Sequence, residues 1–336
     1  MKNIFRTIFD KVNDGVELIL ALVISASGST PRGAGAKMIV FQEGRTEGTI
    51  GGGRLEHICT KTALAAIREK RSFTETYDLS INDADVMGMI CGGSVDVCFK
   101  YFSQEDKELL RHIVSVAEKE EPSWLIVRER PGQIDIGTYD QQRGASFIDE
   151  IDESIADSFT MKRRLFVNKS EKIYVEPLTK RGRVYIFGAG HLTKELAPML
   201  KRLDFHVIVY EEKTELADKF IEDIPLVRGS FGKINENVSM KQDDYAVIMT
   251  SGHWADFEVL EQVLRLNLSY VGVIGSRKKM EITKERLFKA GIEKEKINSI
   301  HTPIGLAIKA ETPAEIAVSV AAELILHRAE RSAGGE

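Results

Sequence analysis

In the stretch Val184-Tyr-Ile-Phe-Gly188-Ala-Gly190-His191-Leu-Thr193, a short apolar run leads into a turn with two glycines and then into a helical pattern. A glycine turn of this kind lets backbone N–H groups approach a phosphate, and the N-terminus of the following helix adds a favourable dipole. The stretch therefore predicts a strand, a phosphate-binding turn and a helix. The alternative interpretation is that the two glycines only allow the helix to pack closely on the sheet.

The nucleotide-binding fingerprint G-x-G-x-x-G is incomplete in this stretch, because Thr193 stands where the third glycine is expected. Glu211, however, ends the next apolar run, 23 residues after Gly188. At that distance an acidic side chain can contact a ribose hydroxyl. Together the turn, the helix and Glu211 favour binding of a nucleotide-like ligand.

From residue 184 onward, apolar runs and amphipathic segments alternate in the rhythm of a parallel α/β sheet. Such sheets bind ligands beyond the carboxyl ends of their strands. His191 follows one of these ends, His253 lies just after another, and Ser276-Arg277 follows a third. We expect strands at 184–187, 205–210, 245–250 and 269–274 and helices at 192–203, 255–267, 277–290 and 312–328.

Polar side chains gather at this predicted rim. A lone histidine in a loop is ordinarily solvated or caps a helix, but His191 and His253 share one edge of the sheet. Arg277 can present a fork of donors to an anionic group, or lie solvated in its basic run. The candidate cofactor-binding residues of this half are Gly188, Gly190, His191, Glu211, His253, Ser276 and Arg277.

The N-terminal half has a different pattern, in which apolar strand-like runs are separated by glycine-rich loops. In residues 28–35 small hydroxyl side chains, a proline and an arginine stand between two such runs, and in residues 51–56 three glycines precede a helical segment. Successive glycine N–H groups ahead of a helix favour an anion. Either loop alone is consistent with a hairpin corner or a bulge, but two loops that both carry an arginine favour anion binding. The candidates are Ser29, Thr30, Arg32, Gly51, Gly52, Gly53, Arg54 and Glu56.

The chain has three cysteines, too few and too odd in number for a disulfide framework, which favours a reducing compartment. Cys91 precedes two glycines, and a thiol there could contact sulfur or a metal, or act as a nucleophile if its pKa were lowered. Cys59 lies in a helical segment and Cys98 in a strand-like one, so both are expected to be small buried hydrophobes.

Length and composition are those of an ordinary globular protein. The 336 residues suggest about two domains, and we expect an N-terminal domain over 1–130, a mixed β and linker region over 131–182 and a parallel-sheet domain over 183–336. The net charge of −5 argues against nucleic-acid binding. No apolar run approaches the ~20 residues that cross a bilayer, and the first residues lack a signal peptide pattern, so a cytoplasmic location without membrane contact is expected. No metal-binding motif is visible.

Taken together, these motifs resemble the XdhC/CoxI family, the accessory proteins of xanthine dehydrogenase and other molybdenum hydroxylases. They occur in the family's order from about residue 20 to 330. The matching stretches are Gly28-Ser-Thr-Pro-Arg32, Gly35-Ala-Lys-Met38, Gly51-Gly-Gly-Arg-Leu-Glu56, Cys91-Gly-Gly-Ser-Val-Asp96, Phe187-Gly-Ala-Gly-His191, Ile274-Gly-Ser-Arg277, His301-Thr-Pro-Ile-Gly305 and Thr312-Pro-Ala-Glu-Ile-Ala317.

The resemblance implies a family-specific N-terminal α+β domain with glycine-rich loops, followed by a Rossmann-like parallel sheet. It also implies that the chain binds molybdenum cofactor, assists its sulfuration and inserts it into an apo molybdenum hydroxylase, without necessarily turning over a substrate. A cysteine desulfurase and a second copy of the chain, as a homodimer, are further partners that it allows. Molybdopterin would then lie between the two halves, with its phosphate on the turn of Gly188 and Gly190 and its ring or metal end facing the N-terminal glycine loops. Cys91 could shield the metal end or pass sulfur to it.

Two positions depart from the family's pattern. Many relatives carry cysteine where this chain has Arg54, so a thiol role cannot be transferred there. The loop that often reads Thr-His-Asp-His in relatives reads Thr-Ser-Gly-His253 here, which weakens a two-histidine site.

Two other functional classes remain open. One is an NAD(P)-dependent oxidoreductase that uses the C-terminal glycine turn and Glu211, although no proton-transfer pair beside a substrate pocket is evident. The other is a regulatory module that senses a nucleotide without chemistry. Fold alone does not separate these classes from a cofactor carrier.

Overall fold

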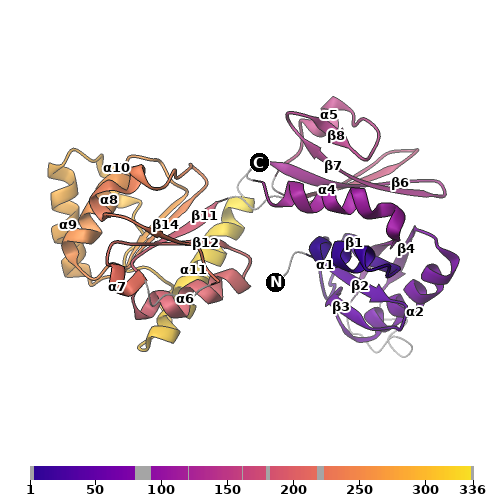
Figure 1. Ribbon diagram of the computed structural model, residues 1–336, viewed down its shortest axis with the longest axis horizontal. Coiled ribbons are helices and arrows are strands. Elements are labelled where there is room, and N and C mark those ends of the chain that lie inside the picture. Colours follow the sequence, from indigo (N-terminus) through magenta and orange to yellow (C-terminus); the bar gives the residue numbers. More distant parts are fainter. Residues whose placement is uncertain are drawn as a thin grey trace. The chain divides into compact units, whose positions relative to one another are not determined.

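The computed structural model describes residues 4–79, 92–119, 121–160, 162–178, 182–217 and 223–333. It divides into two compact units, which we call the N-terminal unit (Lys2–Thr179) and the C-terminal unit (Lys180–Glu336) (Figure 1). Each unit has its own hydrophobic cores and is described by itself below.

The first sheet of the N-terminal unit is wholly antiparallel, with strand order β3-β2-β1-β5-β4. The central strand β1 is buried over its first seven residues because helices cover both faces of the sheet. Its strands are β1 (Leu18–Gly28), β2 (Lys37–Phe41), β3 (Thr46–Thr49), β4 (Phe73–Asp78) and β5 (Gly93–Phe102).

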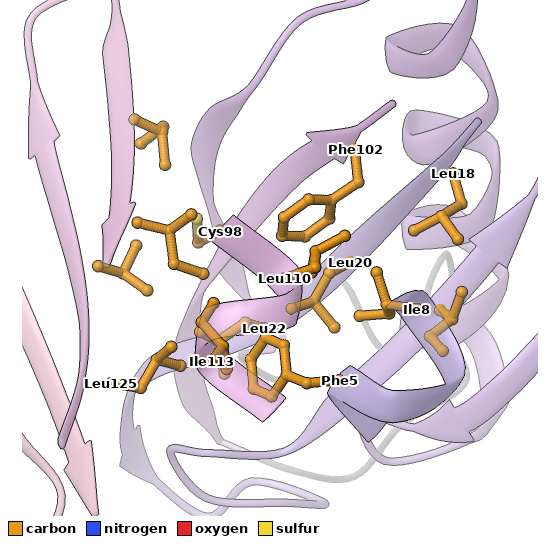
Figure 2. Packing of buried hydrophobic residues seen from close by; sticks show 14 of the residues in the cluster. Phe5, Ile8, Leu18, Leu20, Leu22, Cys98, Phe102, Leu110, Ile113 and Leu125 are labelled. Atoms are coloured by element: carbon orange, nitrogen blue, oxygen red, sulfur yellow. The ribbon is translucent and has the colours of Figure 1, made fainter. Parts of the chain in front are cut away.

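Three helices complete this layer. On one face α1 (Ile4–Asn13) and α4 (Lys107–Ala117) contribute apolar side chains to the core, and the short 3-10 turn η2 (Gln104–Asp106) leads into α4. Figure 2 shows this core, with Phe5 of α1 and Ile113 of α4 beside Leu22 of β1. On the other face α2 (Gly53–Glu69) packs against β1, β2 and β5.

A second antiparallel sheet, with order β8-β7-β6-β10-β9, covers the α1/α4 side of the same core. Its other face holds Trp124 and Phe159 beside the short helix α5 (Glu153–Ala156). Residues 131–182, which the sequence suggested as a mixed β and linker region, thus supply four of its strands. The strands are β6 (Ser123–Arg130), β7 (Gln133–Asp140), β8 (Gly144–Ser146), β9 (Arg164–Val167) and β10 (Lys172–Pro177).

The C-terminal unit has a parallel five-stranded sheet of order β13-β12-β11-β14-β15, which confirms the predicted Rossmann-like fold. The strand order reverses between β11 and β14, the point where such sheets bind ligands. The strands are β11 (Arg183–Phe187), β12 (His206–Glu211), β13 (Leu226–Arg228), β14 (Tyr245–Ile248) and β15 (Tyr270–Val273).

Helices cover both faces of this sheet. One core packs it against α6 (His191–Arg202) and α11 (Pro313–Ala333), and the other against η3 (Phe231–Glu236), α8 (His253–Val263) and α9 (Arg277–Lys289). The short helices α7 (Thr214–Ala217) and α10 (Lys294–Asn298) lie between these elements along the chain. Among the described residues, no helix is long and apolar enough to cross a membrane.

Candidate functional site

Three glycine-containing loops of the N-terminal unit meet at one end of its first sheet. A Cβ atom added at Gly28 would lie 2.6 Å from the carbonyl oxygen of Gly92, and one added at Gly51 would lie 2.7 Å from the Cβ of Pro31. Residues 28–35, 51–54 and 92–93 therefore form one surface, which we call the glycine rim. The sequence predicted each loop separately, and the structure brings them together.

Glu56 organises the start of α2 within this rim. Its Oε2 accepts hydrogen bonds from the Thr49 hydroxyl (2.7 Å) and the Gly52 N–H (2.9 Å), while the Gly51 N–H donates to Thr49 Oγ1 (3.1 Å). Two of the amides expected to face an anion therefore have partners within the protein. The helix itself starts at Gly53 without a side-chain cap, so no such cap competes for the amides of its first turn.

The two arginines of the rim are exposed at its surface. Thr30 Oγ1 donates to the carbonyl oxygen of Arg32 (3.3 Å) and so fixes the bend of the loop, with Ser29 exposed beside it. Among the described residues, no carboxylate lies within ion-pair distance of Arg32 or Arg54. Two guanidinium groups without a carboxylate partner in the described part of the chain, beside a helix start without a side-chain cap, suit an oxyanion.

Cys91 lies outside the described residues, so its role stays a prediction. Cys59 and Cys98 are both fully buried, as expected. Burial raises the pKa of each of these two thiols to about 12, which keeps them protonated and unreactive at neutral pH.

A buried polar cluster beside the glycine rim was not predicted. The Lys37 ammonium lies 2.5 Å from Glu176 Oε1, and Glu176 Oε2 accepts from the Tyr174 hydroxyl (2.8 Å) and from Arg163 Nε (3.3 Å). Lys37 also donates to the Gly35 carbonyl oxygen (3.1 Å). The cluster ties β2 of the first sheet to β10 of the second. Lys37 is the first residue of a strand, and nothing in the sequence around it indicates a partner 139 positions further along the chain.

In the C-terminal unit, the two glycines of the turn have different roles. Gly188 has φ +108°, and a Cβ atom there would lie 2.5 Å from the Met249 carbonyl oxygen, so close packing of β11 on the end of β14 requires glycine. Gly190 has φ −73° and open space around it. Of these two glycines, Gly190 leaves the backbone open to a ligand, at the uncapped start of α6.

Thr193 and Glu211 stabilise this turn. The buried Thr193 hydroxyl donates to the Gly188 carbonyl oxygen (2.5 Å), which explains how threonine replaces the third glycine. Glu211, only 3% exposed, accepts from the Ala189 N–H (2.7 Å) with one oxygen and from the Lys213 N–H (2.8 Å) with the other. In this arrangement Glu211 joins the turn to the end of β12, and a ribose contact stays a prediction.

The other predicted residues of the C-terminal unit also follow the carboxyl ends of its strands. His191 is exposed at the start of α6, while His253 and Arg277 are the first residues of α8 and α9, with side chains outside the described part of the structure. Ser276 caps α9 by accepting from the Lys279 N–H (3.4 Å).

The sequence did not predict an ion pair between α8 and α9 of the C-terminal unit. Asp256, 2% exposed, accepts from the Thr250 hydroxyl (2.5 Å) and pairs with the Lys279 ammonium (2.8 Å). It joins α8 to α9 beneath the loop. An acidic residue in the first turn of a helix was the available signal.

His301 belongs to a second polar cluster of the C-terminal unit. Its Nδ1 lies 2.6 Å from Glu323 of α11, which also accepts from the Tyr270 hydroxyl (2.9 Å) and the Gly305 N–H. Burial acts to raise the pKa of Glu323, but these hydrogen bonds outweigh it and leave the pKa lowered. Across the described residues, no group of three or more His, Cys, Asp or Glu side chains could hold a metal ion.

Two family models match the chain. The XdhC and CoxI family matches residues 12–78, and the XdhC Rossmann domain matches residues 184–324. Together they cover more than half of the chain and include all the candidate residues except Cys91.

The chain is 24% identical over 327 residues to an uncharacterized protein of Escherichia coli K12, YqeB, and spans 46% of that relative's length. It is 26% identical over 340 residues to a Bacillus subtilis protein described as a probable subunit of xanthine dehydrogenase, covering 96% of this chain and 97% of the relative. The crystal structure of a xanthine dehydrogenase from Bacillus halodurans has the same fold, with a TM-score of 0.79 at 21% identity over 99% of this chain and 98% of that one.

Proposed function

Because the chain belongs to the XdhC family, the accessory proteins of xanthine dehydrogenase, we propose that it binds molybdenum cofactor and assists its sulfuration and insertion into an apo molybdenum hydroxylase. Likeness to the Bacillus subtilis relative supports xanthine dehydrogenase as the class of partner.

The glycine rim is the observation that carries this proposal. Molybdopterin is a polar ring system that ends in a phosphate, and a phosphate needs convergent N–H donors and positive charge. The uncapped start of α2 supplies the amides, and Arg32 and Arg54 supply two charges without acidic partners among the described residues. These residues fit the phosphate end of the cofactor, which the sequence alone placed at the turn of Gly188 and Gly190 instead. When bound, the cofactor supplies the molybdenum centre that the hydroxylase needs.

An NAD(P)-dependent oxidoreductase is the competing function, and the geometry gives it less support. The Glu211 carboxylate is buried and accepts two backbone hydrogen bonds from the chain itself. A ribose would have to share an oxygen with one of those amides. His191 is exposed, and no carboxylate in the described part of the chain pairs with it to orient it as a proton donor.

Mass spectrometry of the intact protein tests the proposal. The chain would be purified under native conditions from cells that make the cofactor and from a matched strain that does not. We expect molybdopterin to copurify only from the first strain, with reduced occupancy in Arg54→Gln. Arg68→Gln is the matched control, because Arg68 is an exposed arginine near the opposite end of α2.

Absence of the cofactor from the wild-type protein, or equal occupancy in both variants, would contradict cofactor binding at the glycine rim. Thermal shifts with NAD and NADP test the oxidoreductase alternative, because a ligand that binds the folded state stabilises it in proportion to ln(1 + [L]/Kd). A shift with either dinucleotide, accompanied by reduction of the nicotinamide, would favour that alternative instead.

Sulfuration is tested separately. Activation of an apo hydroxylase by cofactor-loaded protein would be measured for the wild type and for Cys91→Ala, with a cysteine desulfurase present. Loss of activation with unchanged cofactor occupancy would support a sulfur-handling role for Cys91. Unchanged activation would exclude it.

A further inference from the structure

We propose that Arg163, which comes from the segment before β9, is a third arginine of the glycine rim and binds the phosphate group of the ligand there. The inference rests on the proposed function, because it assigns the phosphate of that ligand to a named side chain. Neither the glycine motifs nor the family models single out this residue: Arg163 lies between the two matched ranges.

Arg163 reaches the rim by crossing Gly35. A Cβ atom added at Gly35 would overlap the Nε, Cδ and Cζ atoms of Arg163, and Gly35 has φ +91°. Glycine at position 35 lets the arginine lie against the backbone of the 28–35 loop, and its positive φ also favours glycine. A side chain from the second sheet thus becomes part of a surface that the first sheet builds.

Glu176 holds the guanidinium by its inner nitrogen. Arg163 Nε lies 3.3 Å from Glu176 Oε2, and the Glu176 side chain is 7% exposed, whereas that of Arg163 is 54% exposed. Of the carboxylates in the described residues, Glu176 alone lies within ion-pair distance of Arg163. With Nε facing Glu176, the exposed end of the guanidinium is left to offer donors to an oxyanion.

The group formed by Glu176, Lys37 and Arg163 has a net charge of one positive. Lys37, with its side chain 13% exposed, already pairs with the same carboxylate at 2.5 Å. The third partner, the Tyr174 hydroxyl, is neutral and donates. One carboxylate therefore faces two cations, and the more exposed cation is the one that lies on the rim. A bound phosphate would balance this charge.

Binding of inorganic pyrophosphate, measured by calorimetric titration at constant ionic strength, tests the inference. Arg163→Gln removes the charge, Arg163→Lys keeps the charge but loses the paired donors, and Arg164→Gln is the matched control, because Arg164 is the exposed neighbour in β9. We expect Kd to rise about 10-fold or more in Arg163→Gln. A smaller rise is expected in Arg163→Lys and none in Arg164→Gln.

Failure of the wild type to bind pyrophosphate, or equal Kd values for wild type and Arg163→Gln, would overturn the inference. A purely structural Arg163 would lower the unfolding midpoint in urea and leave Kd unchanged. Should Arg163→Gln fail to fold, Arg163→Lys decides, since a lysine can still pair with Glu176.

The same variants separate this inference from the proposed function. If pyrophosphate binding depends on Arg163 but no molybdopterin copurifies from cofactor-making cells, the proposed function fails and the anion site stands. If molybdopterin copurifies equally with the wild type and Arg163→Gln, the proposed function stands and the inference fails.

Discussion

The buried ion pair between Lys37 and Glu176 makes the N-terminal unit sensitive to loss of either partner. Glu176 is 5% exposed as a residue, and the Lys37 ammonium is enclosed beside it. Burial lowers the pKa of Lys37 from its ordinary 10.5, and pairing with Glu176 opposes this shift. Glu176→Gln keeps the size of the side chain and removes the opposing charge.

The magnitude follows from what Lys37 can do in the variant. An unpaired charge left in a buried site destabilises a protein by about 3–5 kcal/mol. Lys37 can escape part of this by losing its proton, which at pH 7 costs about 4.8 kcal/mol from a pKa of 10.5, at about 1.36 kcal/mol per unit. We therefore expect a loss of about 3–5 kcal/mol in the free energy of unfolding at pH 7.

The pH dependence has a definite sign. Below pH 10.5 the unfolded variant carries a proton on Lys37, whereas a folded variant with neutral Lys37 does not. Because the unfolded state binds one proton more, the free energy of unfolding rises with pH by up to about 1.4 kcal/mol per pH unit. In the wild type, pairing with Glu176 opposes the lowering of the Lys37 pKa, so this rise of stability with pH is smaller. The difference between the two proteins should thus fall to about 2 kcal/mol at pH 9.

Tryptophan fluorescence in urea can measure this loss of stability in the N-terminal unit alone. The chain has two tryptophans, of which Trp124 is buried in the N-terminal unit and Trp254 belongs to the C-terminal unit. In a Trp254→Phe background, Trp124 alone reports unfolding. Glu108→Gln is the control, since Glu108 forms an exposed pair with Arg111 that is worth less than about 1 kcal/mol.

A loss below about 1 kcal/mol for Glu176→Gln at pH 7, or a loss that does not shrink toward pH 9, would refute this account of the pair. A loss of similar size in the Glu108→Gln control would show that the measurement does not isolate the buried pair.

Three further outcomes follow from the structure. Gly188→Ala should destabilise the C-terminal unit by about 3 kcal/mol or more, because a Cβ meets backbone at positive φ, while Gly190→Ala should cost less than about 1 kcal/mol; similar urea midpoints for the two would contradict this. Iodoacetamide at pH 8 should leave Cys59 and Cys98 unmodified until denaturant is added, because burial raises the pKa of both to about 12, and peptide mass mapping that found either one labelled in the native protein would contradict it. The pKa of Glu323 is lowered in the folded state, so its carboxylate stabilises the fold at pH values above the ordinary pKa of 4.5. The wild type should therefore lose stability as the pH falls through and below 4.5, and Glu323→Gln should lack this loss. Parallel curves of stability against pH for the two proteins between pH 6 and pH 3 would refute this role of Glu323.

The C-terminal unit was predictable because its elements follow local rules. Strands were expected at 184–187 and 245–250, and β11 and β14 lie there, since apolar runs of that length fit a sheet covered on both faces. Helix α6 begins at His191, directly after the glycine turn that predicted it. The departures at Thr193 and Glu211 were visible as residue types, but their roles depend on hydrogen bonds to backbone that sequence does not specify.

The N-terminal unit shows where sequence reasoning stops. Its glycine loops were recognised one by one, but their meeting depends on the pairing of β1 with β5, more than 60 residues apart in the chain. Residues 131–182 look broken in sequence because two of their strands, β8 and β9, have only three and four residues. The pair of Lys37 and Glu176 joins two separate sheets, and no local pattern predicts such a contact.

The outer edge of β15 bears on how two copies of the chain could associate. The segment after α10 passes along this strand: the His301 N–H donates to Val271, the Val273 N–H donates to His301, and the Ile304 N–H donates to Val273. Those backbone groups would otherwise be a template for a foreign strand. At this edge the protein's own chain blocks a continuous sheet running from one copy into the next, so two copies that met here would have to do so through side-chain surfaces.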